Sequence, residues 1–223
     1  MRGQMWERLS AVSGLVALAV AGVAGVFERS TPDPDPSAAE VVEFYVANRS
    51  ALLVQSLLFV LSAGIFLWFF VGLRGRLARA EGHTERVSSI VYAAGIAWIV
   101  LNLAVQAPQI ALARAAADGL DPMVAVVVND IGLTLATIAA VPVVVMVAGV
   151  GVLSLRSGVF PAWVGWFSMG TAALHLVAWI GVLADSGPLA PGGWVTFVVY
   201  PVFVVWLGSV AVGMLRSAWS PSR

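Results

Sequence analysis

The sequence contains no cysteine and no lysine, and it is poor in charge of either sign. Only 11% of its 223 residues are charged, against about 25% in ordinary soluble domains. The lack of cysteine excludes disulfides, thiolate metal sites, iron–sulfur clusters and a cysteine nucleophile. The 12 basic residues are all arginine and balance 12 acids. Because no basic patch extends beyond one loop, nucleic-acid binding is not expected.

Apolar residues make up 60% of the chain, and the mean hydropathy is +0.94. Runs of more than about 18 apolar residues mark membrane-spanning helices, because a spanning segment must satisfy its own backbone hydrogen bonds. We therefore predict an all-α integral membrane protein, a six-helix bundle forming one transmembrane domain over residues 1–223. The expected spans are about 9–27, 51–73, 88–113, 123–155, 160–184 and 194–215.

The distribution of arginine predicts the orientation of the bundle. Arginines near span ends are retained on the cytoplasmic side of a membrane. With the N-terminus inside, nine arginines are cytoplasmic and three are outside, while most acids are outside. Both termini are therefore expected in the cytoplasm.

Local signals predict further helix ends. Ser37 and Glu40 have the spacing of a capping box after the proline-rich run 31–36, so an external helix is expected over about 37–49, lying on the outer interface or rising from the second span. Asp121 and Pro122 suit an N-cap and a first helical position. Kinks are expected at the prolines inside apolar runs, which are Pro108, Pro142 and Pro201.

Small residues recur every fourth position in the first span, at Ser13, Ala17, Ala21 and Gly25. Such a ladder lets another helix approach closely in lipid. Packing inside the bundle is the favoured interpretation, and a homodimer seam or a larger membrane complex is the alternative.

Polar residues within the spans gather toward the outer face. Counting about 20 residues inward from the cytoplasmic arginines at 1.5 Å per residue places most of them near the outer boundary, with His175 about five residues deeper. We predict that they form a ligand-binding collar. Its members are Gln55, Gln106, Gln109, Asn129, Asp130, His175 and Tyr200.

The collar lacks catalytic spacing. There is no His-Glu-x-x-His, Gly-x-Ser-x-Gly or phosphate-loop motif, and one acid with one histidine cannot build a metal site, so neither enzyme activity nor a metal is expected. Cofactors are not expected either, although haem ligation through His175 is left open. The favoured function is a non-enzymatic scaffold or a binder of a lipid-like or small apolar ligand at the outer leaflet, with membrane lipids as partners. The alternative is a small transporter, proton-coupled if Asp130 and His175 face each other.

The run 43–49, Glu-Phe-Tyr-Val-Ala-Asn-Arg, leads into 66–77, Phe-Leu-Trp-Phe-Phe-Val-Gly-Leu-Arg-Gly-Arg-Leu. Across the first three spans this pattern resembles a group of small, uncharacterised six-span bacterial membrane proteins. The resemblance implies six helices and a bacterial plasma membrane location, and it implies no activity, cofactor or site residue.

Overall fold

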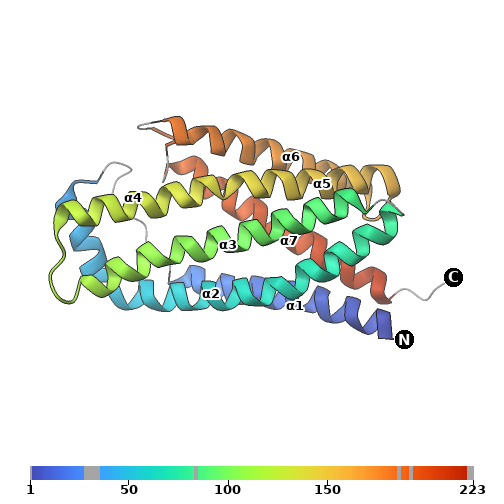
Figure 1. Ribbon diagram of the computed structural model, residues 1–223, viewed down its shortest axis with the longest axis horizontal. Helices are drawn as coiled ribbons and strands as arrows, with labels where there is room; N and C mark the ends of the chain where they lie inside the picture. Colours follow the sequence, from blue (N-terminus) through green and yellow to red (C-terminus); the bar gives the residue numbers. More distant parts are fainter. Residues whose placement is uncertain (1, 28–35, 83–84, 185–186, 191–192, 220–223) are drawn as a thin grey trace.

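The computed structural model describes residues 2–27, 36–82, 85–184, 187–190 and 193–219 (Figure 1). These residues form helices and connecting turns, with no strand among them. Six helical segments are long and apolar enough to cross a membrane, which confirms the all-α, multi-pass prediction. The helices are α1 (Arg2–Val26), α2 (Ala38–Glu81), α3 (Arg86–Ala115), α4 (Pro122–Ile138), α5 (Ala140–Ser157), α6 (Ala162–Ile180), the 3₁₀ turn η1 (Gly181–Leu183) and α7 (Trp194–Trp219).

The helices pack as a ring in chain order. Each packs against its neighbours in sequence, and α7 returns to pack against α1, with α4 and α5 together filling one place in the ring. The start of α1 and the end of α7 lie at the same end of the bundle (Figure 1). We call this the arginine-rich end, because eight of the described arginines lie at helix ends there: Arg2, Arg8, Arg74, Arg76, Arg79, Arg86, Arg156 and Arg216.

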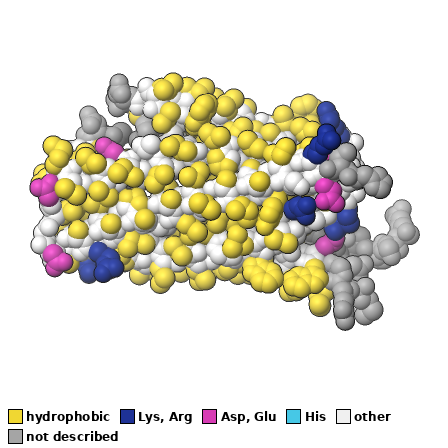
Figure 2. Space-filling view, in the orientation of Figure 1, with side chains coloured by type: hydrophobic (Ala, Val, Ile, Leu, Met, Phe, Trp, Pro, Cys, Tyr) yellow, Lys and Arg dark blue, Asp and Glu magenta, His cyan; other side chains and the backbone are white. Residues whose placement is uncertain are grey.

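The opposite end, here called the far end, carries Arg49, Arg114, Asp118 and Asp121. Between the two ends the visible face is covered mainly by hydrophobic side chains (Figure 2). Such a band is typical of a surface that contacts lipid, because apolar side chains there replace the polar surface of a soluble protein.

Helix α2 is a single helix of 44 residues, about 66 Å long at 1.5 Å per residue. The expected external helix over 37–49 is therefore the first part of α2 and rises from the second span. Its predicted capping box is present, since the Glu40 amide donates to Ser37 Oγ and the Ser37 amide to the Glu40 carboxylate at 2.8 Å. Donation from the Ser37 hydroxyl and amide lowers the pKa of Glu40, which precedes the predicted second span. Most of the proline-rich run, residues 31–35, lies outside the described residues.

The apolar run 123–155, predicted as one span, is two helices separated at Ala139. Pro142 has no amide proton to donate to the carbonyl of Ile138, so the helical ladder is interrupted there. Asp121 accepts a hydrogen bond from the Val124 amide at 3.0 Å and Pro122 follows it, which confirms the expected start of α4. Pro108 and Pro201 lie within unbroken helices α3 and α7.

The core fills the middle of the ring and the arginine-rich half. Phe69, Phe70, Trp206 and their neighbours are almost fully buried. Two of the small residues predicted as a ladder on α1 pack within the bundle: Ala17 and Ala21 are buried, and the Ala17 carbonyl accepts a hydrogen bond from Ser62 Oγ of α2 at 2.8 Å. Gly25 is exposed, and an added Cβ there meets nothing within 4 Å. A separate apolar cluster joins α2, α3 and α4 at the far end, around Phe44, Tyr45, Leu112 and Ala125.

Candidate functional site

A cavity of about 240 Å³ lies inside the ring, between α1, α2, α3, α4 and α7. Four of the seven predicted collar residues line it, namely Gln55, Gln106, Gln109 and Tyr200. These four come from three different helices, so the common depth read from the sequence corresponds to a common place in the fold.

A second cavity of about 150 Å³ lies beside the first and is lined by His175 and, again, Tyr200. The two cavities have six lining residues in common: Trp98, Asn102, Val105, Ala136, Tyr200 and Phe203. Because they share these walls, the two spaces form neighbouring parts of one hollow region.

The walls of the larger cavity follow from helical periodicity. Gln55, Phe59, Ser62 and Phe66 recur along one face of α2. Residues three, four or seven apart lie on the same side of a helix, so the polar and aromatic members of this face point to one place. Trp98, Asn102, Val105 and Gln109 repeat the arrangement on α3.

The collar prediction missed Asn102, Trp98 and Phe203, which line both cavities. Their spacing from Gln106, Gln109 and Tyr200 on the same helices is the signal that identifies them. Trp98 packs edge-on against Phe203 with ring centroids 5.2 Å apart, and also against Phe66 at 5.6 Å. The floor of the cavity is therefore aromatic.

Gln109 is the best-bonded polar residue of the cavity. Its Nε2 donates to Ser56 Oγ at 2.8 Å and to Gln55 Oε1 at 3.3 Å. A third contact joins Nε2 to the Leu52 carbonyl at 3.4 Å. These contacts join α3 to α2, and they give the Gln55 carbonyl oxygen a hydrogen-bond donor within the protein.

Gln106 is different, because its acceptor is unused. Its Nε2 makes a long contact of 3.5 Å to the carbonyl of Asn102, which sets the orientation of the amide. Its Oε1 is buried and has no hydrogen-bond partner within the described part of the chain, and the residue is only 9% exposed. A buried acceptor left unbonded costs about 1–3 kcal/mol, so this atom is suited to receive a donor from a ligand.

The described residues that line the larger cavity carry no formal charge. The smaller cavity is also lined by His175, which is buried and whose Nδ1 lies 2.8 Å from the Thr171 carbonyl. When Nδ1 carries the proton and donates to that carbonyl, Nε2 is an acceptor. The hollow region thus has aromatic walls, neutral amide and hydroxyl groups, and an unpartnered acceptor on Gln106.

Asn129 does not line either of these two cavities. It is buried on α4, where its Oδ1 accepts a hydrogen bond from the Tyr45 hydroxyl at 3.1 Å. The bond joins α4 to α2 beside the far-end apolar cluster. Asn129 therefore has a packing role in the structure, away from the other collar residues.

Asp130 lies on the outer surface of α4. It is exposed, and it borders a shallow depression together with Val127, Ile131, Thr134 and Leu135. Over the described residues, no hydrogen bond or ion pair joins it to His175, which is buried in the smaller cavity. The structure does not bring Asp130 and His175 together.

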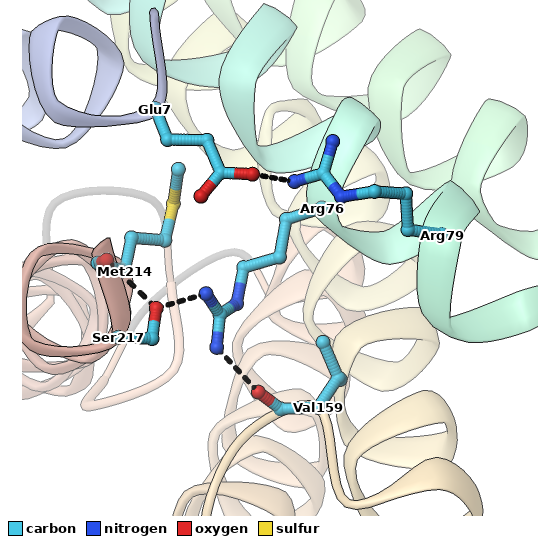
Figure 3. Close-up of polar contacts among 6 residues, drawn as sticks. All are labelled: Glu7, Arg76, Arg79, Val159, Met214 and Ser217. Atoms are coloured by element: carbon cyan, nitrogen blue, oxygen red, sulfur yellow. Dashed lines mark hydrogen bonds and ion pairs between the residues drawn. The ribbon is translucent and has the colours of Figure 1, made fainter. Parts of the chain in front are cut away.

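The charged cluster at the arginine-rich end is organised around Arg76 (Figure 3). Its guanidinium donates to the carbonyl of Val159 at 2.9 Å and to the hydroxyl of Ser217, and its Cζ lies 4.9 Å from the centre of the Phe160 ring. Arg79 pairs with Glu7 of α1 beside it. Arg76 thereby joins α2 to the α5–α6 turn and to α7. These contacts hold the helices together at the arginine-rich end of the ring.

Within the described residues, no group of three His, Asp or Glu side chains is placed to hold a metal ion. No family model matches the chain, and no curated protein or solved structure matches it. The resemblance to small six-span bacterial proteins therefore stays a prediction, and the cavity is the feature of the structure that points to a function.

Proposed function

We propose that the chain is a multi-pass protein of the bacterial plasma membrane that binds a lipid-like or small apolar ligand in the larger cavity, without catalysing a reaction. The observation that carries the proposal is an uncharged, aromatic-walled cavity holding the buried, unpartnered acceptor of Gln106. Ligand sites are commonly apolar hollows with a few convergent polar groups, as this one is.

The ligand is proposed to come from the outer leaflet. Eight described arginines lie at one end of the bundle, against Arg49 and Arg114 at the other. This distribution supports a cytoplasmic location for the arginine-rich end. Gln55, Gln106 and Gln109 lie toward the far end of their helices, so the polar part of the cavity would be near the outer boundary. Membrane lipids are then the most accessible partners.

The proposal is tested by retention of ligand during purification. Native mass spectrometry in mild detergent should show non-covalent added mass on the wild-type protein. Ala136 lines both cavities and is itself exposed, so Ala136→Phe places a ring at their shared wall. This variant should lose the added mass, whereas Ala173→Phe, an exposed position on α6 outside both cavities, should retain it.

A wild-type protein without added mass that also fails to take up an added apolar probe would contradict the proposal. Equal retention by the two phenylalanine variants would place the bound molecule elsewhere on the protein. A small transporter is the alternative function, and vesicle flux tests it directly. The proton-coupled form of that alternative requires both Asp130 and His175, so it fails if Asp130→Asn transports normally.

A further inference from the structure

We propose that the ligand of the larger cavity is a single-chain lipid bearing a neutral hydrogen-bond donor, in the simplest case a hydroxyl, which Gln106 Oε1 accepts. This inference rests on the proposed binding function and specifies the chemistry of its ligand. It also makes Gln106 the residue that determines specificity.

The need for a donor follows from the hydrogen bonds around Gln106. Its Nε2 is directed to the Asn102 carbonyl, which leaves the buried Oε1 as an acceptor without a partner. An ether, ester or ketone oxygen offers only a second acceptor and cannot bond to it. A hydroxyl supplies the missing proton, and it does so without bringing a charge into the site.

The neutrality of the ligand follows from the lining residues. None of the described residues around the larger cavity is Asp, Glu, Lys, Arg or His. Moving an ion into such a site without a counter-charge is strongly unfavourable. A lipid amine, carboxylate or phosphate therefore does not suit this cavity, while an alcohol does.

The size and shape indicate one chain. The cavity of about 240 Å³ is smaller than the roughly 300–1,000 Å³ typical of pockets for drug-sized molecules. Gln106 and Trp98 are eight residues apart on α3, so the polar end and the aromatic floor are separated by about 12 Å along the helix. A slender apolar chain fits this space better than a ring system or a two-chain lipid.

The packing also indicates a path from the bilayer. Helix α6 packs along α5 but touches α4 at few points, so the ring is loosest toward the far end. Ala136 of α4 and Tyr200 of α7 line both cavities and are exposed, Tyr200 by 44%. A chain in the surrounding lipid can enter between these helices without first passing through water.

The level of Gln106 matches the place of a lipid hydroxyl. Gln106 lies 20 residues beyond Arg86, which begins α3 at the arginine-rich end. Twenty residues of helix span about 30 Å, the thickness of the hydrocarbon core. The acceptor is thus at the membrane boundary where polar head groups are found, while Trp98 and Phe66 lie deeper, where the chain would be.

The test compares two competitors, an alcohol and its methyl ether, of which only the alcohol has a hydrogen-bond donor. The protein, in mild detergent, is labelled with dodecanol carrying a diazirine at the chain end, and unlabelled dodecanol or dodecyl methyl ether is added as competitor. For the wild-type protein, the alcohol should compete at about a tenfold lower concentration than the ether, the effect expected for one buried hydrogen bond. Peptides containing Trp98 or Phe203 should carry the label.

Gln106→Leu should abolish the difference between alcohol and ether. Asn48→Leu is the matched control, because it also replaces an amide by leucine, at a half-buried position of α2 that lines neither cavity. This control should keep the tenfold preference. The comparison on the wild-type protein stands by itself if Gln106→Leu does not fold.

Equal competition by the alcohol and the ether would overturn the inference and leave the proposed binding function in place, as expected if a water molecule occupies the acceptor. A preference for the alcohol that survives Gln106→Leu would assign the specificity to another residue and overturn the inference in the same way. Failure of both competitors, with no label in the cavity, would contradict the inference and the proposed function together.

Discussion

The close approach of α1 and α2 gives a sharp prediction about a single methyl group. A Cβ added at Gly14 would lie 2.5 Å from Cδ2 of Phe69 and 3.1 Å from its Cγ. The Phe69 ring is fully buried and packs edge-on against Phe66 and Phe70, so it has no free space to turn into. Gly14→Ala must therefore separate the two helices or distort the aromatic cluster.

Overpacking of this kind costs about 1–3 kcal/mol. Replacing a helical glycine by alanine otherwise gains about 1 kcal/mol, so the net expectation is a loss of up to about 2 kcal/mol in unfolding free energy. Gly22→Ala is the matched control on the same helix, because Gly22 is exposed and an added Cβ meets nothing within 4 Å. It should be neutral or slightly stabilising.

Unfolding in mixed micelles by increasing SDS, followed by near-ultraviolet circular dichroism, measures both variants. Gly14→Ala should unfold at a lower SDS fraction than the wild type, and Gly22→Ala at the same or a higher fraction. If the two variants behave alike, α1 and α2 are not packed at the distance that the structure gives.

Three further predictions address the orientation, the closure of the ring and the collar. Because the native chain has no cysteine, Ala117→Cys should react with an impermeant thiol reagent on intact cells and Ser157→Cys should not; reversed labelling would invert the topology. Trp206→Phe removes the 2.8 Å hydrogen bond from Nε1 to Ser168 Oγ between α7 and α6 and should lower stability by about 0.6–1.7 kcal/mol in the SDS titration, whereas no loss would show that this bond does not hold the ring closed. Asp130→Asn should leave ligand retention in native mass spectrometry unchanged, since Asp130 is on the outer surface; a loss would return it to the site.

The spans and several helix ends were predictable because they depend on local properties. The apolar runs and the Ser37–Glu40 capping box each depend on one continuous stretch of sequence, and the structure has both. The break between α4 and α5 at Ala139 was harder to predict from the sequence. Pro142 predicts a disturbed helix, but whether the disturbance bends the helix or divides it depends on how the neighbouring helices pack.

The collar was partly predictable for a related reason. Counting residues along a helix gives the depth of a side chain, but it does not give the direction in which that side chain points. Asn129 and Asp130 have nearly the same depth, yet successive residues on a helix point about 100° apart. One therefore bonds to Tyr45 inside the protein and the other is exposed.

Direction becomes predictable where several polar or aromatic residues recur on one face. Gln109, Asn102 and Trp98 of α3 show this, since they lie seven and four residues apart and all line the larger cavity. A single residue such as Asp130 offers no such repetition. The surroundings of Asp130 depend on which faces of α4 are covered by neighbouring helices. That is known only once the helices are assembled into the ring.

A crystal structure of the protein purified with its native lipids tests the central claim most directly. The proposal of a ligand-binding cavity predicts elongated density between Gln106 and Trp98, with a donor atom within hydrogen-bond distance of Gln106 Oε1. A cavity filled by rearranged side chains, or one containing only separate water molecules, would contradict it.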